Sequence, residues 1–506
     1  MILAMTSSAV LEGPAWCAPG LDTKGSRFPL RVEAPVMNLV DVLVPGVSTM
    51  TSNSRYFGLY WALADYAHDR DFDTLTCRTV LRRAEVVLAL ASVLDPETGD
   101  LNGPGEMHGA DTVRSRLPKG VDRLVEIGDK SYSPRAWGYW SQYKGPVVTL
   151  GLATTDREAF RKGPRETPVA VRNMFRPLLE LAASRNPSRG DAERFVELTR
   201  FRSDSKDLAP LRTVLTATGD GMDWKPNDVT RRSTYRILAR AVQLTPDSSS
   251  WTSALLDAVA YGPALNEDPL LTTEGLRAQS WRGLLLRHRF VGAWRRLWSR
   301  LVDRVLNSSG QVSRSDLHEW VRACITTKDT VRGFLQSCPD AFDARGNPAP
   351  AEMLLADRDQ VEADIGILLI GSVRDDELDG VTRRAFRGNS DRGRYLDPQW
   401  VAHRRREYLD RPMTDFACAV VDDMLDQSHR VALAKMYVDK EGRMKLPTKL
   451  QERNGLFFAT GREGSGNVGL RTEQLGELGR QLGLFEVDED RRVVTELGAT
   501  ILGLPR

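Results

Sequence analysis

The sequence WRGLLLRHRFVGAWRRLWSRLVDRV, residues 281–305, decides the fold class because apolar side chains repeat at helical spacing over its whole length. Residues three or four positions apart lie on the same face of a helix. Arginines fill most of the other positions, and Asp303 is the only acid. The segment therefore predicts one long helix with a core face and a basic face. The predicted core positions are Trp281, Leu284, Leu285, His288, Val291, Trp294, Trp298, Leu301 and Val305.

The basic face of this helix has two interpretations. A row of arginines can follow a phosphate backbone, where each neutralised phosphate releases counterions. The same row is also typical of the solvated face of a core helix. The candidate nucleic-acid-binding residues of this segment are Arg282, Arg289, Arg295, Arg296 and Arg300.

Helical periodicity continues on both sides of this segment. Apolar residues recur at intervals of three and four in residues 56–67 and 81–94, and a further helix is predicted for 414–437. At roughly 150 residues per domain, a chain of 506 residues suggests about three domains. We therefore expect a mainly α, multidomain protein. The expected ranges are a loose leader at 1–35, an N-terminal helical domain at 36–165, a basic helical middle domain at 166–340, a charge-segregated helical connector at 341–412 and a winged-helix-like C-terminal domain at 413–506.

The C-terminal range combines helices with short strands. Asn454-Gly455 is a hairpin signal between two alternating segments, 444–450 and 456–460. A helix at 472–482 precedes a second predicted hairpin, 484–494, and a last helix, 496–502, that Thr495 caps. A helix, a two-stranded wing and a closing helix form the order expected of a winged-helix (α+β) module.

The predicted winged helix has a mixed charge. The residues expected to face outward on its first helix are Thr472, Glu473, Gln474, Glu477, Arg480 and Gln481. Two acids against one base oppose a phosphate backbone unless neighbouring arginines compensate, so DNA contact and protein docking both remain open. The candidate nucleic-acid-binding residues of this region are Arg462, Arg471, Arg480, Arg491 and Arg492.

A formal net charge of +2, from 70 Lys plus Arg and 68 Asp plus Glu, excludes a uniformly basic protein. The composition is that of an ordinary globular protein and excludes a collagen or a disordered tail. The charges are nevertheless segregated, because residues 340–379 hold eleven acids and three arginines, while 383–406 hold eight arginines and two acids. The basic segment can contact phosphates or pair with the acidic one. Its candidate binding residues are Arg383, Arg384, Arg404 and Arg405.

Two motifs suggest chemistry only weakly. Gly464, Gly466 and Gly469 match a GxGxxG pattern, but too little chain follows to build a parallel sheet, so a structural turn or a phosphate-contacting loop is favoured over a dinucleotide site. Four acids between Asp357 and Asp364 are spaced like a solvated helical face, although a divalent metal is an alternative. The six histidines form no HExxH, and neither GxSxG nor a P-loop occurs. We therefore expect no cofactor and no catalytic residue.

The cellular location follows from the cysteines and the apolar runs. Five scattered cysteines form no CxxC pair, which argues against a zinc site and a disulfide framework. The first 20 residues lack the features of a signal peptide. The longest apolar runs are far below the ~20 residues that span a bilayer. We expect a cytoplasmic protein with no membrane partner.

The sequence LVPGVSTMTSNSRYF, residues 43–57, resembles an uncharacterised bacterial family with an LxPGxST…RYF signature. Such proteins are often encoded in anti-phage defence islands beside helicases and phospholipase-D-type nucleases. Residues 280–301 and the DQSHRVALAK segment at 426–435 are similar to these proteins too. The resemblance implies a defence role and large partners, and it assigns no catalytic residue. From the residues alone, Arg55 is either a phosphate or partner contact or, as favoured, a buried anchor between the leader and the first helices.

These observations lead to three hypotheses. The first is a non-catalytic subunit of an anti-phage system that binds DNA, a partner helicase or nuclease, or both. The second is a winged-helix transcriptional regulator. The third is a metal-dependent nuclease that uses the acids at 357–364.

Overall fold

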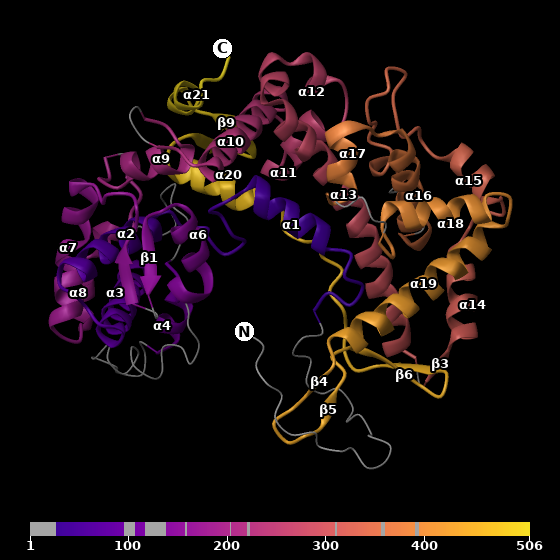
Figure 1. The fold of residues 1–506 in the computed structure, drawn as a ribbon, viewed down its shortest axis with the longest axis horizontal. Coiled ribbons are helices and arrows are strands. Elements are labelled where there is room, and N and C mark those ends of the chain that lie inside the picture. The colour runs from indigo at the N-terminus through magenta and orange to yellow at the C-terminus, as the bar shows by residue number, and fades with distance from the viewer. Residues whose placement is uncertain are drawn as a thin grey trace. The chain divides into compact units, whose positions relative to one another are not determined.

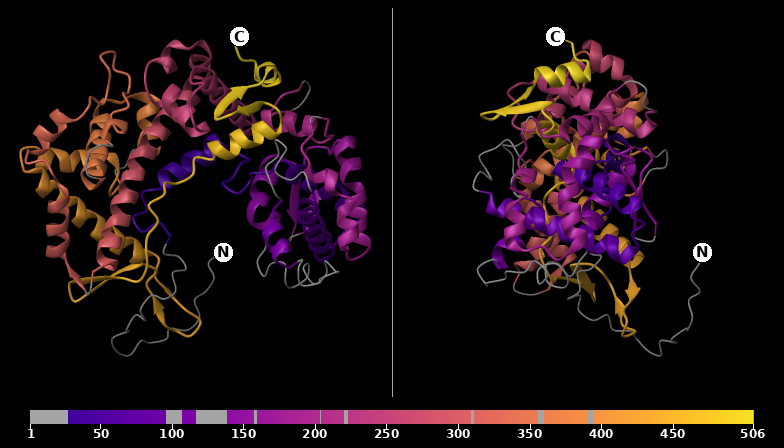
Figure 2. Two further views of the ribbon diagram at one scale, coloured as in Figure 1. Left: turned by 180° about the vertical axis from the view of Figure 1, so that it is seen from behind. Right: turned by 90° about the vertical axis from the view of Figure 1, so that its left-hand side faces the viewer.

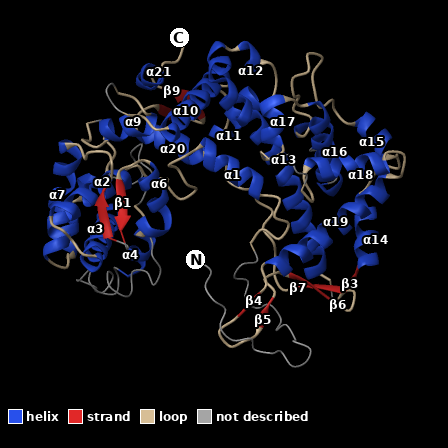
Figure 3. Cartoon of the chain, in the orientation of Figure 1, coloured by secondary structure: helices blue, strands red, loops and turns tan. Residues whose placement is uncertain are grey.

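The computed structural model describes residues 27–95, 107–116, 138–156, 159–202, 204–219, 223–308, 311–355, 360–389 and 394–505. Helices dominate this part of the chain, and its strands form only small antiparallel sheets (Figures 1 and 3). The predicted mainly helical fold is confirmed. Within the described ranges, every helix is too short or too polar to cross a membrane.

The contacts divide the chain into two compact units, and neither unit is continuous in sequence. The described part of unit 1 is 27–39, 260–262 and 279–468, and that of unit 2 is 40–259, 263–278 and 469–505. Helices α1 (Ala34–Leu43) and α13 (Pro269–Leu306) contribute residues to both units. The limits of the units fall at positions other than those of the five expected ranges, which stay predictions, and most of the 1–35 range lies outside the described residues.

Unit 2 is built around helix α2 (Arg55–Asp69), which is buried from Arg55 to Ala67 and packs against α7 and β2. A helix surrounded on all sides can be apolar around its whole circumference. The other elements of this region are α3 (Thr74–Leu94), α4 (Ala110–Arg116), η3 (Tyr139–Tyr143), α6 (Lys144–Thr149), β1 (Ala153–Asp156), β2 (Ala159–Lys162), α7 (Val169–Ser184), α8 (Arg189–Glu193), η4 (Val196–Thr199), α9 (Leu208–Thr216), α10 (Pro226–Leu244), α11 (Trp251–Leu255), η5 (Leu256–Ala260) and α12 (Ala264–Glu267).

Arg55 begins α2 and is completely buried. Its guanidinium lies 2.5 Å from Asp207, which is also completely buried, and donates a 2.7 Å hydrogen bond to the carbonyl of Arg200. A buried charge requires such a partner. The predicted burial of Arg55 is confirmed, but its place as an anchor to the leader is wrong for the described residues, because its ion-pair and carbonyl partners lie at residues 200–207. The side chain ties α2 to the start of α9.

Unit 1 contains most of α13 and the helices that pack around it. The apolar residues of the predicted core face of α13 are all buried, and His288 is half-buried, so the predicted helix at 281–305 is confirmed. The helix extends back to Pro269 through a non-helical Gly275. The other elements are β3 (Val312–Ser313), α14 (Arg314–Cys324), α15 (Val331–Ser337), η6 (Met353–Leu355), α16 (Gln360–Glu377), α17 (Gly380–Phe386), α18 (Pro398–Tyr408), α19 (Met413–Ala434), β4 (Tyr437–Val438), β5 (Met444–Lys445), β6 (Leu450–Arg453) and β7 (Leu456–Ala459).

The hairpin predicted at Asn454-Gly455 is confirmed, with a corrected first strand. Both turn residues have positive φ, +50° and +74°, which suits the tight turn joining β6 and β7. The first strand begins at Leu450, because residues 444–445 pair instead with β4. Strand β3 completes a three-stranded antiparallel sheet in the order β3-β7-β6.

The last elements, α20 (Thr472–Gln481), β8 (Phe485–Asp488), β9 (Arg491–Val494) and α21 (Glu496–Leu502), belong to unit 2. Their predicted order is confirmed, and the Thr495 hydroxyl caps α21. Helix α20 packs closely on α11, since a Cβ at Gly476 would lie 2.3 Å from the Trp251 ring. The prediction that Thr472 and Gln481 face outward is wrong, because both are buried. Thr472 lies against Thr252 of α11, and the Gln481 amide donates to Ser52 O and accepts from Ser54 N, just before α2.

Candidate nucleic-acid interface

The candidate site is a basic surface on α13 in unit 1, together with residues 461–468, which run along the helix. We define the α13 surface as six cations of unit 1: Arg295, Arg296, Arg300, Lys435, Lys449 and Arg462. Arg295 and Lys449 donate to carbonyl groups of the segment, and Arg462 is part of it. The segment is the extended golden trace before α20 in Figure 2. The surface combines three arginines predicted from the helical pattern with one predicted near the C-terminus.

Side chains of α13 hold the segment through its carbonyl groups. The Arg295 guanidinium donates to Gly466 O at 2.5 Å, and the Ser299 hydroxyl donates to Glu463 O at 2.8 Å. In return, Asn467 Nδ2 donates to His288 O at 2.7 Å. Gly292 permits this approach, because a Cβ there would lie 2.7 Å from Asn467 Nδ2.

His288 fixes the end of the segment. Its Nε2 lies 2.8 Å from the carbonyl of Val468, so this nitrogen must carry the proton that is shared. Burial lowers the pKa of His288 to about 4. The imidazole is therefore neutral at pH 7, in the tautomer that donates from Nε2.

Buried carboxylates lie beneath the cations. Glu33 is 2.5 Å from the Arg295 guanidinium, and Asp364 of α16 accepts from both Arg296, at 2.6 Å, and Arg300. The side chains of Glu33 and Asp364 are only 2% and 3% exposed. Burial raises the pKa of Asp364, although the two arginines oppose this shift.

The cations lie closer to solvent than these carboxylates. Arg296 and Arg300 are 35% and 26% exposed, and Arg462 is 75% exposed. An arginine has five N–H donors, so a paired guanidinium still presents donors to solvent. The buried carboxylates fix the arginine side chains, whose exposed atoms lie on the solvent side.

The GxGxxG glycines do not form a dinucleotide-binding turn. The described sheets are all antiparallel, whereas that fold requires a strand, a tight turn and a helix in a parallel sheet. A Cβ at Gly464 or Gly466 would meet open space. Their role here is to keep an exposed, extended segment free of side chains.

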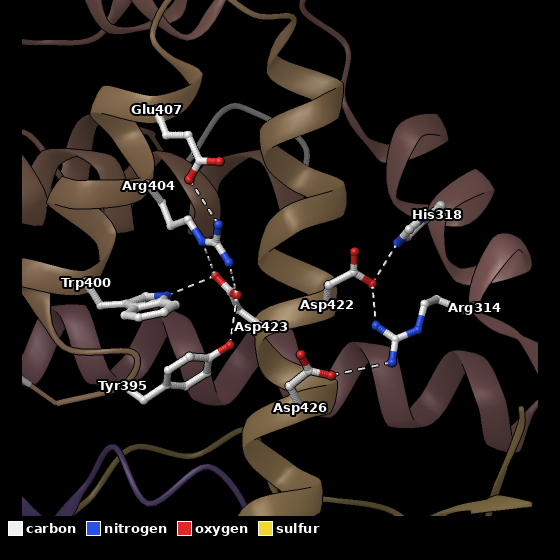
Figure 4. Close-up of polar contacts among 9 residues, drawn as sticks. All are labelled: Arg314, His318, Tyr395, Trp400, Arg404, Glu407, Asp422, Asp423 and Asp426. Carbon is white, nitrogen blue, oxygen red and sulfur yellow. Dashed lines mark hydrogen bonds and ion pairs between the residues drawn. The ribbon is translucent and has the colours of Figure 1, made fainter.

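The arginines at 383–406 form a different arrangement, centred on α18 and α19 (Figure 4). Arg404 pairs with Asp423 at 2.8 Å, and the same buried carboxylate accepts from the Tyr395 hydroxyl and from Trp400 Nε1, both at 2.9 Å. Four donated hydrogen bonds, two of them from Arg404, satisfy Asp423. This group joins α18 to α19.

A second carboxylate of α19, Asp422, faces the opposite side and binds α14 (Figure 4). His318 Nε2 and Arg314 Nη1 lie 2.9 Å and 2.8 Å from the same Asp422 oxygen. A His–Asp pair can serve as a base, but the arginine on the same oxygen stabilises the carboxylate and weakens that role. The pair acts as a link between the two helices.

Several other arginines of this basic segment pair with the acidic segment, as one interpretation predicted. Arg387 lies 2.7 Å from Asp375, while Arg405 and Arg406 both pair with Asp376. Arg383 is half-buried and Arg384 is exposed, and neither forms an ion pair with a described residue.

The remaining predicted arginines lie in several environments. Arg282 is buried and donates to the carbonyl of Gly262 at 2.8 Å, and burial lowers its pKa to about 10. Arg289 is half-buried on the same helix. In unit 2, Arg471 pairs with Asp41, Arg480 with Glu477 and Arg491 with Asp247, while Arg492 lies over the Trp251 ring.

The structure describes two of the four acids at 357–364. Asp357 and Asp359 lie outside the described residues. Glu362 accepts hydrogen bonds from the backbone and hydroxyl of Thr326, and Asp364 pairs with Arg296 and Arg300 of the α13 surface. The favoured interpretation of a solvated acidic face is wrong for these two acids, because both are buried. In the part of the chain that the structure describes, His, Cys, Asp and Glu side chains form no group of three or more placed to hold a metal ion.

Sequence reasoning missed Lys435, Lys449, Glu33 and Glu463. These residues lie far from α13 in sequence, and Glu33 is separated from Arg295 by 262 positions. Their local patterns contain no signal of this contact. Only the glycine-rich character of 461–469 indicated an unusual backbone there.

Comparison with known proteins gave no match to a family model, a curated protein or a solved structure.

Proposed function

We propose that the chain is a non-catalytic, cytoplasmic subunit of a bacterial anti-phage defence system and that it binds DNA through the α13 surface. The observation that supports this proposal most strongly is that buried carboxylates hold more exposed arginines in place. Buried Glu33 and Asp364 hold the arginines from below, and the guanidinium groups lie outside them. A preorganised cation loses less conformational freedom on binding a phosphate.

The exposed segment at 461–468 supports a backbone contact rather than the recognition of bases. It has no side chain at Gly464 and Gly466, where a Cβ would meet open space. A phosphate can therefore approach the peptide N–H groups closely, beside Arg462. Phosphate contacts position a protein on DNA and carry little sequence information.

A finer proposal concerns the C-terminal elements. We propose that α20, β8, β9 and α21 form a winged-helix-like segment that docks a partner protein, such as a helicase or nuclease of the same system. Arg480 is paired with Glu477, and Glu473 is also exposed, so α20 presents little free positive charge. Such a surface suits a protein better than a phosphate backbone.

Salt-dependent DNA binding tests the main proposal. Affinity for duplex DNA should fall steeply as salt rises. Arg462→Glu should weaken binding by about tenfold. It should also reduce the slope of log affinity against log salt concentration by roughly one or more, as expected when at least one phosphate contact is lost. Arg462 is suited to this test because it is 75% exposed and its carboxylate partner, Asp303, lies 3.8 Å away.

Arg332→Glu is the matched control. Arg332 lies in the same unit, is 51% exposed and pairs with Asp410 at 2.8 Å. Equal losses for Arg462→Glu and Arg332→Glu, or no DNA binding at low salt, would overturn the proposal. DNA cleavage by the purified protein with Mg²⁺ would overturn the non-catalytic assignment, and sequence-selective binding would favour the regulator.

A further inference from the structure

Unit 1 contains a cavity of about 290 Å³ that shares no residue with the α13 surface. Helix α19 forms one wall with Leu425, Ser428 and His429. The segment around β6 and its hairpin turn forms the other wall, which includes Gln451 and Phe457. The volume is close to the lower limit for drug-sized ligands, so the cavity fits a small molecule or a single chemical group.

Both walls of the cavity contain apolar side chains. Leu425 and Ala432 of α19 are 4% and 3% exposed, while Leu450 and Phe457 of the opposite wall are 6% and 3% exposed. Apolar groups on both sides, one of them aromatic, suit a ligand with a flat apolar body.

Two buried polar side chains line the cavity without a partner. Ser428 and Gln451 are 4% and 7% exposed, and neither forms a side-chain hydrogen bond with a described residue. Thr448, on the same wall, is different because its hydroxyl donates to the carbonyl of Leu450 at 2.8 Å. The polar atoms of Gln451 and Ser428 are not among the fully buried side-chain atoms that lack a partner, so they reach the open space of the cavity. A ligand in the cavity can therefore form hydrogen bonds with them.

The chemistry of the lining restricts the ligand further. The Gln451 amide presents a donor and an acceptor side by side, and Asn454 adds a second amide at the exposed turn. The charges at the rim, Glu452 and Arg453, are opposite in sign and favour neither an anion nor a cation. A small, flat, uncharged molecule with adjacent donors and acceptors on one edge meets these conditions.

We propose that this cavity binds a nucleobase. Asparagine and glutamine amides pair with the adjacent donor and acceptor of a base edge, and aromatic rings suit its faces. The base can belong to a free nucleoside or to an unstacked nucleotide of a single strand. The proposal does not depend on DNA binding by the α13 surface.

Titration of the full chain with adenosine, guanosine, cytidine and uridine, followed by calorimetry, tests the proposal. At least one nucleoside should bind with an affinity that is insensitive to salt, because the nucleosides are uncharged. Gln451→Leu should weaken binding by about tenfold, since it removes the amide and keeps an apolar side chain of similar size. Ser428→Ala provides a second variant, and Gln336→Leu, at an exposed position of α15, is the control that should bind normally.

Thermal unfolding without ligand gives a second measurement. Gln451→Leu should not lower the unfolding temperature, because the Gln451 amide forms no side-chain hydrogen bond with a described residue and leucine packs better against the apolar lining. The absence of binding by all four nucleosides at about 1 mM, equivalent to a binding free energy of about −4 kcal/mol, would overturn the proposal. Unchanged affinity in both Gln451→Leu and Ser428→Ala would overturn it too.

Competition identifies the source of the base. Displacement of the nucleoside by a single-stranded oligonucleotide supports a base within a strand, and persistence of the nucleoside supports a free ligand. Arg462→Glu separates the two proposals, because it should weaken duplex DNA binding and leave nucleoside binding unchanged.

Discussion

Glu85 of α3 is a carboxyl group buried among tyrosines in unit 2. The Tyr60 hydroxyl donates to it at 2.7 Å, and the backbone N–H of Tyr139 donates at 2.9 Å. Burial raises the pKa of Glu85 to about 7, although these two hydrogen bonds oppose the shift. The folded protein therefore holds a proton near neutral pH that an exposed glutamate has already lost.

This proton predicts a pH dependence of stability. Between pH 4.5, the ordinary glutamate value, and about 7, the folded state binds more protons than the unfolded state. The free energy of unfolding should then fall as pH rises through this window, by up to about 3 kcal/mol, and level off above it. Urea unfolding at pH 5 and pH 8 measures the change.

Glu85→Gln should remove most of this dependence, because an amide does not titrate and can still accept both hydrogen bonds. Glu180→Gln, at a 47% exposed site of the same unit, is the control and should keep it. A Glu85→Gln protein with an unaltered pH profile would contradict the prediction.

At the scale of residues, sequence patterns predicted which side chains are buried or charged, but not which residues they contact. The buried tryptophans of α13 follow from helical periodicity alone. The pairing of Arg296 and Arg300 with Asp364 depends on a contact between α13 and α16, more than 60 positions apart. The segregation of charge along the chain predicted that ion pairs between distant segments can form. Which residues pair is determined by how the helices pack in the fold.

Two glycines of α13 allow close contacts of different kinds. A Cβ at Gly283 would lie 2.3 Å from the backbone carbonyl of Thr382, at α17. A Cβ at Gly292 would lie 2.7 Å from the terminal nitrogen of Asn467. Backbone of a packed helix cannot move cheaply, whereas a side-chain end can rotate away.

The same substitution at these glycines should therefore have different effects. Alanine gains about 1 kcal/mol of helix propensity over glycine at either position. Gly283→Ala should nevertheless lower the free energy of unfolding by about 2 kcal/mol, because the overpacking separates α13 from α17. Gly292→Ala should change it little and instead increase proteolysis within 461–468. Chemical denaturation and limited proteolysis measure both effects, and equal destabilisation by the two variants would disagree with this account.

Elements with strong local signals were predictable, and their partners were not. The Asn-Gly turn and the cap at Thr495 act over a few residues, so the β6–β7 hairpin and α21 follow from the sequence. The pairing of β7 with β3 joins Phe457 to Val312 and has no local signature. The winged-helix interpretation rested on element order alone, and element order does not specify packing.

At the scale of the whole molecule, the two units are interleaved along the chain. Residues 413–468 belong to unit 1, and 469–505 belong to unit 2. The length of the chain indicated several domains, but turn-rich segments could not reveal that each unit collects distant pieces.

This organisation predicts that residues 413–506 do not fold alone. Their halves would expose apolar surface that other parts of each unit cover, such as Leu475 and Leu478 of α20, which are fully buried. Circular dichroism of the isolated fragment should show no cooperative thermal transition. A sharp transition would instead favour an independent C-terminal module.

The interleaving also has a consequence for the growing chain on the ribosome. Unit 2 lacks α20, β8, β9 and α21 until the ribosome has passed residue 469, although most of its other helices are complete by residue 259. At 5–20 residues per second, this interval lasts on the order of 10 to 40 s. During that time α20 does not yet cover the apolar surface that includes Trp251. Chaperones that bind apolar surface should therefore engage the nascent chain mainly between these two points of its synthesis.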